Sequence, residues 1–599
     1  MTSLSAKTLG QLGTAVAVPR YDRRRVTTGI AHISVGNFHR SHQAMYIDTL
    51  MNAGAALDWG ICGIGLQPSN AAMRDVMAAQ DGLYTLVMRH GDGTWEPRVI
   101  GSVVEYLLAP DDPDAVIEKL ASPGIRIVSL TVTEGGYNLD SVTGEFRSSD
   151  PLVQADLRPG AVPQTVFGLV TEALARRRDR GIPAFTVLSC DNIQGNGHVS
   201  QRVFTGFARL RDPALAGWMT GHVSFPNCMV DRITPQTTDE DRAALSRRFG
   251  IEDRWPVLCE PFTQWVLEDS FAAGRPPLED AGVQIVPDVE PYELMKLRLL
   301  NASHQALCYP GYLVGYRFVH DVTSDPLFAR FLLDYMLGEA IPTLRPVPGI
   351  DLVAYAHQLI ERFSNPGVGD TVARLCANAS DLIPKFLLPV VREQLDRGGP
   401  VTRAAAVVAC WARYCEGTDE SGQSVEMDDA LAPQLRRAAE RQGGYPAAFL
   451  EDNRSVFGEL ADDPRFTRVY LAVLGSLRSR GVRATLADLD RFSKEGLLCG
   501  ALSLTRGRSR WRRRRSRRRG RVRLWSGRSW WGCAARTCTR CVDATRSFRC
   551  LTGPVMRSSG SSRHSARPER DLGGRRPPGR RVTGSSWSRT CPAGRARCA

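Results

Sequence analysis

The sequence predicts an α/β domain with a mostly parallel sheet, then a mainly α-helical domain and an arginine-rich tail. Short apolar runs typical of buried strands alternate with helical patterns before residue 288. Beyond that point, apolar residues recur at helical spacing and few strand candidates remain. The composition changes abruptly near residue 500. We therefore predict domains at 28–287 and 288–497, because so long a body exceeds one core, and a tail at 500–599.

The first predicted strand leads into a glycine turn. Residues 30–35 form a mostly apolar run, Gly36 follows, and a helix-like run begins after it. A strand, a glycine turn and a helix together present backbone N–H groups to a pyrophosphate. The full GxGxxG motif is absent, because Ser34 stands where its first glycine would be. Taken alone, this pattern is open both to a nucleotide site and to an ordinary turn.

Polar segments follow two of the later strands. Further strands are predicted at 59–66, 125–132, 184–189 and 283–286, with a helix at 166–177 between two of them. The polar segments 131–137 and 189–196 begin where two of these strands end. Ligands bind at the carboxyl ends of parallel strands. Asn192 can donate an amide N–H to a developing alkoxide there, although a capping or turn asparagine explains it equally well.

Lysine is almost absent from the chain, which has five lysines against 72 arginines. One of them, Lys296, follows Glu293 and precedes Asn301 and His304. Lysine can act as a general base once burial lowers its pKa, whereas arginine cannot. On an α-helix these four side chains fall within an arc of about 140° and can converge on one pocket. The structural alternative is an amphipathic helix with a solvated lysine and a satisfied histidine.

The tail accounts for the positive charge of the chain. Residues 501–599 hold 28 arginines, no lysine and three acidic residues, a net charge of +25, whereas the first 500 residues carry −11. An arm of this kind can bind nucleic acid. A coding sequence read in the wrong frame yields the same mixture of residues, and we favour this explanation. In both cases we expect a disordered tail, because it has too little apolar surface to offset the entropy of ordering.

The remaining composition is that of a cytoplasmic protein. No segment approaches the ~20 apolar residues of a membrane span, and the N-terminus lacks the apolar run of a secretory signal. The nine cysteines of the first 500 residues are scattered without a CxxC pair. They suit a reducing compartment and provide no zinc-site spacing. We therefore expect a cytoplasmic protein that works without a metal ion.

Six motifs, in order along the chain, resemble those of the long-chain polyol dehydrogenases. They are GNFHRSH at 36–42, QDGLY at 80–84, TVTEGGY at 131–137, CDN at 190–192, FPNCMVDRI at 225–233, and Lys-x4-Asn-x2-His at 296–304. The resemblance extends from about residue 28 to about residue 495. Within that family the chain resembles the mannitol 2-dehydrogenase group most closely, with fructuronate and tagaturonate reductases as relatives.

The resemblance implies a Rossmann-like N-terminal domain and a mainly helical C-terminal domain, with the substrate held between them. It also implies zinc-independent hydride transfer between NAD and C2 of a polyol or ketose, such as mannitol and fructose. Such a reaction needs a base with a near-neutral pKa and donors aimed at the developing charge. A buried lysine and side-chain amides meet these two needs.

The resemblance assigns roles to the matching residues. Lys296 becomes the general base, while Asn192 and Asn301 hold the alkoxide-like oxygen. His304 orients the substrate hydroxyls, and Glu293 gates proton exchange with solvent. The implied substrate-binding residues are Val230, Asp231 and Arg374. The implied cofactor-binding residues are Val35, Gly36, Asn37, Phe38, Asn70, Thr133 and Glu134.

Three positions depart from the family pattern. Ser34 replaces a glycine, but serine is small and we expect cofactor binding to survive. Residues 67–70 carry no carboxylate where NAD-preferring relatives place an acid for the adenosine ribose. Asn70 can still bond the ribose but repels a 2′-phosphate less, so we expect NAD, with NADP still open. Leu382 stands where relatives carry a basic residue, which leaves the length and charge of the substrate open.

Two other functions stay open at this point. A ketohexuronate reductase of the same family would need an extra cation for the substrate carboxylate, and the sequence offers none beyond Arg374. A nucleic-acid-binding protein would act through the tail. We expect a small polyol or ketose as the binding partner, a monomeric protein, and no membrane or nucleic-acid partner.

Overall fold

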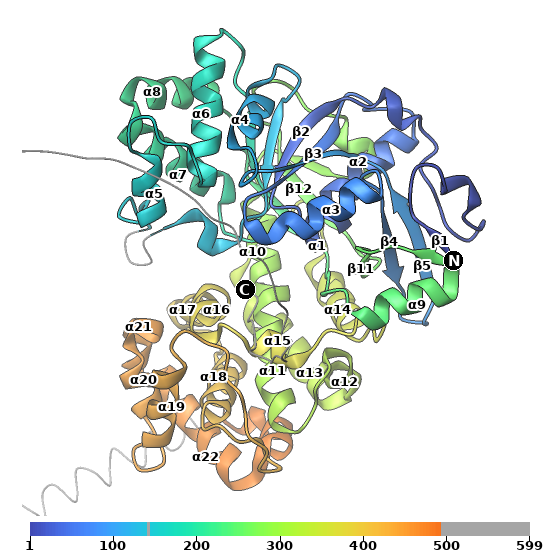
Figure 1. Cartoon of the computed structure of the whole chain (residues 1–599). Helices are drawn as coiled ribbons and strands as arrows, with labels where there is room; N and C mark the ends of the chain where they lie inside the picture. The colour runs from blue at the N-terminus through green and yellow to red at the C-terminus, as the bar shows by residue number, and fades with distance from the viewer. Residues whose placement is uncertain (140–143, 493–599) are drawn as a thin grey trace, which may run out of the picture. The chain divides into compact units, whose positions relative to one another are not determined.

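The computed structural model describes residues 1–139 and 144–492 (Figure 1). A five-stranded parallel sheet forms the centre of the first part, in the order β6-β3-β2-β7-β8. Its strands are β2 (Thr28–Ile33), β3 (Gly60–Gly65), β6 (Val103–Leu108), β7 (Ile127–Leu130) and β8 (Thr186–Ser189). This order, with the first of the five strands in the middle, is that of a dinucleotide-binding sheet. The predicted Rossmann-like fold is therefore confirmed.

Helices cover both faces of this sheet, as its continuous apolar strands require. On one face, Ala31 and Ile33 belong to a core that includes α4 (Pro113–Ala121), α6 (Val166–Asp179), α7 (Asn196–Arg211) and α8 (Pro213–His222). On the other face, Ile30 belongs to a core that includes α2 (Gln43–Asn52) and α3 (Ala71–Ala79). Because successive side chains of a strand point to opposite faces, a single apolar run contributes to two cores.

The first strand ends earlier than predicted because the backbone turns at Ser34. Its φ of 68° lies in the left-handed region, which is uncommon for any residue but glycine. The Ser34 N–H still donates to the Ile64 carbonyl at 2.8 Å, so the turn stays attached to the sheet. The single helix predicted after Gly36 is two helices, α1 (Asn37–Ser41) and α2, separated at His42.

Three smaller sheets were not predicted. One is two-stranded and pairs β1 (Thr2–Ser3) with β10 (Ile251–Glu252). Of the two three-stranded sheets, the first has the order β11-β4-β5 and the second has the order β13-β12-β9. Their strands are β4 (Tyr84–Arg89), β5 (Trp95–Ile100), β11 (Val257–Cys259), β9 (Cys228–Asp231), β12 (Gln264–Glu268) and β13 (Gln284–Val286). The strand predicted at 283–286 is thus present as β13, but it lies outside the main parallel sheet. The second three-stranded sheet places Asp231 at the end of β9, close to the main sheet's carboxyl edge.

From residue 290 onward the described chain is helical, as predicted. The segments are α10 (Glu290–Met295), the π-helix η6 (Lys296–Asn301), α11 (Ala302–Leu313), α12 (Val319–Ser324), α13 (Pro326–Tyr335), a second π-helix η7 (Met336–Ala340), the 3-10 helix η8 (Ile341–Thr343), α14 (Leu352–Phe363), α15 (Val372–Cys376), α16 (Ala379–Phe386), α17 (Leu388–Arg397), α18 (Thr402–Tyr414), α19 (Ala432–Arg441), α20 (Ala448–Asp452), α21 (Arg454–Phe457), the 3-10 helix η9 (Gly458–Ala461) and α22 (Pro464–Ala487). Residues 288–492 are called the helical part below, and residues 1–287 the α/β part.

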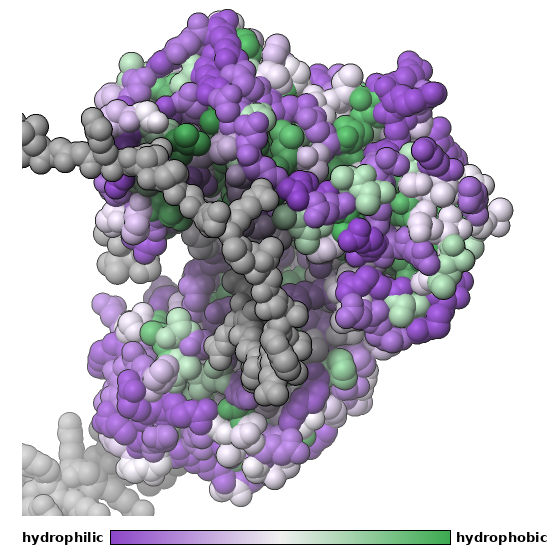
Figure 2. All heavy atoms as spheres, viewed as in Figure 1, coloured by the Kyte–Doolittle hydropathy of each residue, from purple (hydrophilic) through white to green (hydrophobic). Residues whose placement is uncertain are grey.

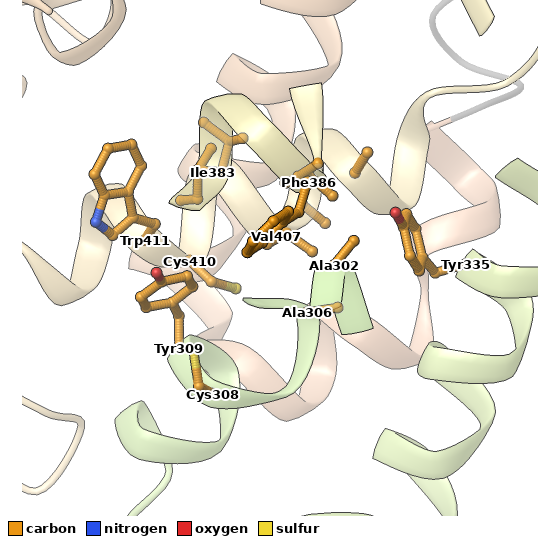
Figure 3. Close-up of a cluster of buried hydrophobic side chains, with 14 of the residues drawn as sticks. Ala302, Ala306, Cys308, Tyr309, Tyr335, Ile383, Phe386, Val407, Cys410 and Trp411 are labelled. Carbon is orange, nitrogen blue, oxygen red and sulfur yellow. The ribbon is translucent and has the colours of Figure 1, made fainter. Parts of the chain in front are cut away.

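The core of the helical part lies around α11 and α18. Residues 404–412 of α18 are all fully buried. Figure 3 shows Ala302 and Ala306 of α11 near Val407 and Phe386, where their small side chains permit close packing. Since α11 continues directly from the π-helix, this core holds the segment that carries Lys296 in place.

Hydrophilic residues predominate on the displayed face of the described residues, with apolar residues scattered among them (Figure 2). Within the described ranges, no helix combines the length and apolar character needed to span a bilayer. The predicted domain limits at 287 and 497 stay predictions. The predicted disordered tail at 500–599 lies outside the described residues.

Truncation after Gly500 should leave folding and activity intact. Among the described residues the buried core extends to Leu489, and every residue assigned a role by the sequence precedes residue 375. Removing the tail's net charge of +25 should also increase solubility. Thermal melting and turnover of the full and truncated chains, measured at physiological salt, provide the test. A fall in Tm of more than about 4 °C, which is about 4 kcal/mol for roughly 500 residues, would contradict it.

Candidate active site

A buried lysine meets the carboxyl edge of the main sheet. The Lys296 Nζ donates to the Asn192 Oδ1 at 2.6 Å. Asn192 follows β8, whereas Lys296 begins the π-helix of the helical part. Both side chains line a small cavity together with Val230 and Glu293. A larger hollow of about 700 Å³ adjoins them and is lined by Glu134, Asn192, Leu297, Lys385 and Phe386 among others.

The lysine lies on a π-helix and not on the α-helix that its spacing predicts. Residues Lys296–Asn301 form i→i+5 hydrogen bonds. The wider turn brings Asn301 closer to alignment above Lys296 than an α-helical turn would. Such π segments occur frequently at functional sites. Lys296 and Glu293 line the same small cavity, whereas the convergence of Asn301 and His304 on it stays a prediction.

Burial lowers the pKa of Lys296 from its ordinary value. The ammonium loses hydration in this site, and the nearby Arg362 guanidinium lowers the pKa further. Asp231, Glu293 and Cys228 act in the opposite direction and favour the charged form. The balance leaves a lysine that can lose its proton more readily than a solvated one.

Two buried polar atoms beside the lysine have no hydrogen-bond partner among the described residues. They are the Oδ1 of Asn301 and the Nε2 of His304. Burial lowers the pKa of His304 to about 3, and Arg374 contributes in the same direction. His304 is therefore neutral near pH 7. Because buried polar groups nearly always find a partner, these two atoms mark where a polar ligand can bind.

Glu293 lies one turn before Lys296, as predicted, and is hydrogen-bonded to Gly195 of the α/β part. Its carboxylate accepts the Gly195 N–H at 3.0 and 3.1 Å. Burial raises the pKa of Glu293 to about 7. It can therefore take up or release a proton at neutral pH.

Asp231 and Val230 end strand β9 and are both buried. Asp231 is held by Arg362, whose Nη1 and Nη2 donate to its two oxygens at 2.8 and 3.1 Å. Arg362 is not among the site residues predicted from the sequence. One signal for it exists, because the buried stripe of α14 runs through Tyr355, Leu359 and Phe363 and includes this arginine. A charged residue on an apolar helix face requires a buried partner.

Arg374 lies near His304 but is already paired. Its Nε and Nη2 donate to the Asp370 carboxylate at 2.7 and 2.6 Å, and about half of its side chain is exposed. Leu382 is partly buried against the helical core. Lys385, one turn further along α16, forms ion pairs with Asp381 and with Glu134. The sequence analysis did not identify Lys385 as a site residue.

The predicted cofactor-binding turn has free space around Gly36. A Cβ built on Gly36 would meet only the Ser34 carbonyl oxygen, at 4.0 Å. Packing within the protein therefore does not require glycine here, whereas close approach of a pyrophosphate would. The neighbouring Val35 is buried, and the Asn37 Oδ1 accepts from Arg40. Phe38 stacks on His42 at 4.9 Å between ring centroids. This open turn fits a dinucleotide.

The loop after β7 is strained and firmly held. Thr133 has a φ of 64°, which is unfavourable for a β-branched residue. The Asp191 carboxylate accepts the N–H groups of Val132 and Thr133 at 3.0 and 2.8 Å, and the Tyr137 hydroxyl at 2.7 Å. Asp191, which the sequence analysis did not name as a site residue, therefore fixes the loop that presents Glu134.

Asn70 already has a structural role after β3. Its Oδ1 accepts the Gln67 N–H at 2.9 Å and so caps the short helix at Pro68–Asn70. The amide nitrogen of Asn70 is a donor, so it can serve a ribose hydroxyl but adds no negative charge. Among the described residues, no group of three or more His, Cys, Asp or Glu side chains is arranged to hold a metal ion.

The strand order, the open glycine turn and the helical second part define a dinucleotide-binding α/β protein with its polar site at the sheet's carboxyl edge. Two family models cover most of the described chain. The mannitol dehydrogenase Rossmann domain matches residues 28–280, and the mannitol dehydrogenase C-terminal domain matches residues 288–475. The chain therefore belongs to the mannitol dehydrogenase family, as its six motifs predicted.

Individual relatives agree with this assignment. The mannitol 2-dehydrogenase of Phaeosphaeria nodorum is 47% identical over 489 residues, which is 81% of this chain and 85% of that protein. A solved structure of Pseudomonas fluorescens mannitol 2-dehydrogenase, a ternary complex with NAD and D-mannitol, is 46% identical with a TM-score of 0.75. That match covers 82% of this chain and 100% of the other. A substrate-free D-sorbitol dehydrogenase is 39% identical with a TM-score of 0.73, over 81% of this chain and 100% of that one.

Replacing Glu293 by Gln should flatten the pH dependence of stability. A carboxyl whose pKa rises from 4.5 to about 7 binds its proton more tightly in the folded state. Its stabilising contribution is complete below pH 4.5 and is lost as the pH rises through 7. The shift is worth at most about 3 kcal/mol. In thermal melts at about pH 5 and about pH 8, we expect the Tm of Glu293→Gln to change less than that of the wild type.

A second buried carboxyl provides the matched control. Burial also raises the pKa of Glu339 to about 7, within the helical part. Glu339→Gln should flatten the same stability profile. An unchanged profile in Glu293→Gln would show that Glu293 is ionised throughout this pH range.

Proposed function

We propose that this protein is an NAD-dependent mannitol 2-dehydrogenase, which interconverts D-mannitol and fructose by hydride transfer at C2. The observation that carries the proposal is the 2.6 Å bond from Lys296 to Asn192 at the carboxyl edge of the Rossmann-like sheet. A related enzyme of known structure binds NAD and D-mannitol together. The buried lysine supplies the base that this chemistry requires.

NAD, when bound, would accept the hydride that leaves C2 of the polyol. The protein's own task is to remove the proton of the C2 hydroxyl. Lys296 can do this because burial lowers its pKa, so it loses its proton more readily than a solvated lysine. In the direction of fructose reduction, the same ammonium returns the proton to the oxygen.

Asparagine amides hold the reacting oxygen. The Asn192 Oδ1 accepts from Lys296, so its Nδ2 is left to donate to the oxygen on which negative charge develops. Asn301 offers a second amide beside the lysine, with its Oδ1 available to a substrate hydroxyl. The neutral His304 presents Nε2 to another hydroxyl. These three side chains orient the polyol and stabilise the alkoxide-like oxygen.

Glu293 connects the lysine to solvent in this proposal. It lines the same small cavity as Lys296, and its pKa of about 7 permits proton exchange in both directions. Val230 lines the same small cavity as Lys296, and Asp231 follows it at the end of β9, so we assign both to substrate binding. Arg374, which influences the pKa of His304, is assigned to the far hydroxyl groups of the sugar chain, which it can meet while it stays paired with Asp370.

The cofactor residues are those of the open turn and the two loops beside it. Val35, Gly36, Asn37 and Phe38 present the turn between β2 and α1 to the pyrophosphate. Thr133 and Glu134 follow β7, at the same edge of the sheet. Asn70 follows β3 and reads the adenosine ribose through its amide nitrogen.

A neutral substrate fits this site better than a sugar acid. A ketohexuronate would need a free cation for its carboxylate, but Arg374 is paired with Asp370, and Lys385 with Glu134 and Asp381. The nucleic-acid alternative concerns only the tail, which lies outside the described residues. A monomer stays our prediction. Among the described residues, eight cysteines are buried free thiols, so we propose a reducing compartment, the cytoplasm.

A panel of polyols assayed with NAD and with NADP tests the proposal. We expect D-mannitol with NAD to give the highest kcat/KM, and fructose with NADH to be reduced. The panel should include D-sorbitol, D-arabinitol and a ketohexuronate. Preference for the ketohexuronate would replace the proposed function by a sugar-acid reductase.

Lys296→Ala should abolish most turnover while sparing cofactor binding. The variant loses the base, and positioned acid–base groups typically contribute about 10²–10⁴ in rate. NADH affinity, followed by fluorescence titration, should stay near the wild-type value. External primary amines should restore part of the activity. Lys119→Ala, which removes a surface lysine paired with Glu105, is the matched control and should retain full turnover. The assignment would be wrong if Lys296→Ala kept more than about a tenth of wild-type turnover.

Asn70→Asp should sharpen the preference for NAD. The aspartate keeps the oxygen that caps residues 67–70 and adds a negative charge that repels a 2′-phosphate. We therefore expect the ratio of kcat/KM for NAD to that for NADP to rise at least several-fold. Asn70→Ala removes the cap without adding charge and should weaken both cofactors alike. An unchanged ratio in Asn70→Asp would mean that another residue reads the ribose.

A further inference from the structure

A buried arginine joins the helical part to the α/β part beside the proposed base. Arg362 extends from α14 to Asp231 on β9 and to Glu260, which follows β11. Its side chain is 5% exposed, and those of the two carboxylates 4% and 2%. Four charged hydrogen bonds connect the three groups at 2.7–3.1 Å. Charged groups that are buried need this kind of complete hydrogen bonding, because they have lost their contact with water.

The groups around the arginine fix its orientation. Its guanidinium lies over the Phe262 ring, 3.8 Å from the centroid. The Glu260 Oε1 accepts the Ile233 N–H at 2.6 Å, and its carbonyl accepts from Arg232 at 3.0 and 3.1 Å. Glu260 is therefore anchored to the chain that follows β9. Arg362 has little freedom to move relative to Asp231.

Asp231 connects this cluster with the proposed base. Burial alone would raise the pKa of Asp231, but Arg362, Lys296 and His304 bring it below its ordinary value. Asp231 is thus an anion that faces both the lysine and the substrate-orienting histidine. An isolated anion in that position would favour the protonated lysine and so oppose its action as a base.

We infer that Arg362 is a positioning residue for the proposed mannitol reaction, on which this inference rests. It holds the Asp231 carboxylate in place through two hydrogen bonds. Its positive charge also offsets the effect of the negative carboxylate on the protonation of Lys296. The two effects are separable. Holding the carboxylate depends on the planar guanidinium with its several N–H donors, whereas the electrostatic effect depends only on the positive charge.

The charged and titratable groups that influence Lys296 come from several elements. They are Asp231 and Cys228 from β9, Glu293 from α10, Arg362 from α14, and His42 between α1 and α2. Asp191, after β8, also lines the small cavity of Lys296. Burial lowers the pKa of His42 to about 3, so it is neutral at working pH. Loss of Arg362 removes a positive charge that lowers the pKa of Lys296, so we expect that pKa to rise.

The test compares Arg362→Gln, Arg362→Lys and the wild type in both directions of the reaction. The measurement is kcat/KM against pH for D-mannitol oxidation with NAD and for fructose reduction with NADH. In Arg362→Gln we expect the acidic inflection of oxidation and the basic inflection of reduction both to move up by about one pH unit, which is about a tenfold change in the proton affinity of Lys296. In Arg362→Lys the charge is kept, so both inflections should stay near the wild-type pH.

Arg362→Lys separates positioning from charge. A lysine cannot bridge both oxygens of Asp231 and both of Glu260, so KM for D-mannitol should rise several-fold while the inflections stay. A lower rate in Arg362→Gln with unmoved inflections would overturn the inference and leave a purely structural arginine. If Arg362→Gln does not fold, a wild-type KM in Arg362→Lys overturns it, and a raised KM with unmoved inflections supports it. A wild-type enzyme inactive on all polyols would instead refute the proposed function.

Discussion

The hydrogen bond from the Lys296 Nζ to the Asn192 Oδ1 is the contact on which the site depends. It joins the π-helix of the helical part to the loop after the last strand of the main sheet. Burying a lysine is unfavourable for folding, and the same burial lowers its pKa. In the proposed reaction, this unfavourable burial is what makes Lys296 suited to act as the base. The packed core around α11 and α18 offsets it, since α11 extends directly from the π-helix.

The charged groups that influence the pKa of Lys296 come from both the α/β part and the helical part. Asp231 and Glu293 favour the ammonium, while burial and Arg362 favour the amine. Near-neutral chemistry needs these opposing effects to be of similar size. In the proposed mechanism, the Asp231 carboxylate is compatible with a lysine base because the Arg362 guanidinium is hydrogen-bonded to it.

The cofactor side of the site relies on backbone geometry more than on charge. Ser34 and Thr133 both have positive φ values, at the ends of adjacent strands β2 and β7. Such strain persists only where surrounding bonds hold it. The Thr131 hydroxyl donates to the Ser34 carbonyl, and Asp191 accepts two N–H groups of the neighbouring loop. Gly36 stays open between them, which leaves room for a dinucleotide.

The sequence by itself determined the fold class, the family and the residues around Lys296. Apolar runs of strand length, helical spacing and ordered motifs are local patterns that can be identified without a structure. Asn301 and His304 could be grouped with the lysine because one helical segment carries all three. The π-helix could not be predicted, since its i→i+5 bonding depends on how the segment packs. Only the tertiary structure showed that Arg362 meets Asp231, 131 residues away, because such a pairing depends on the packing of the whole chain and not on local pattern.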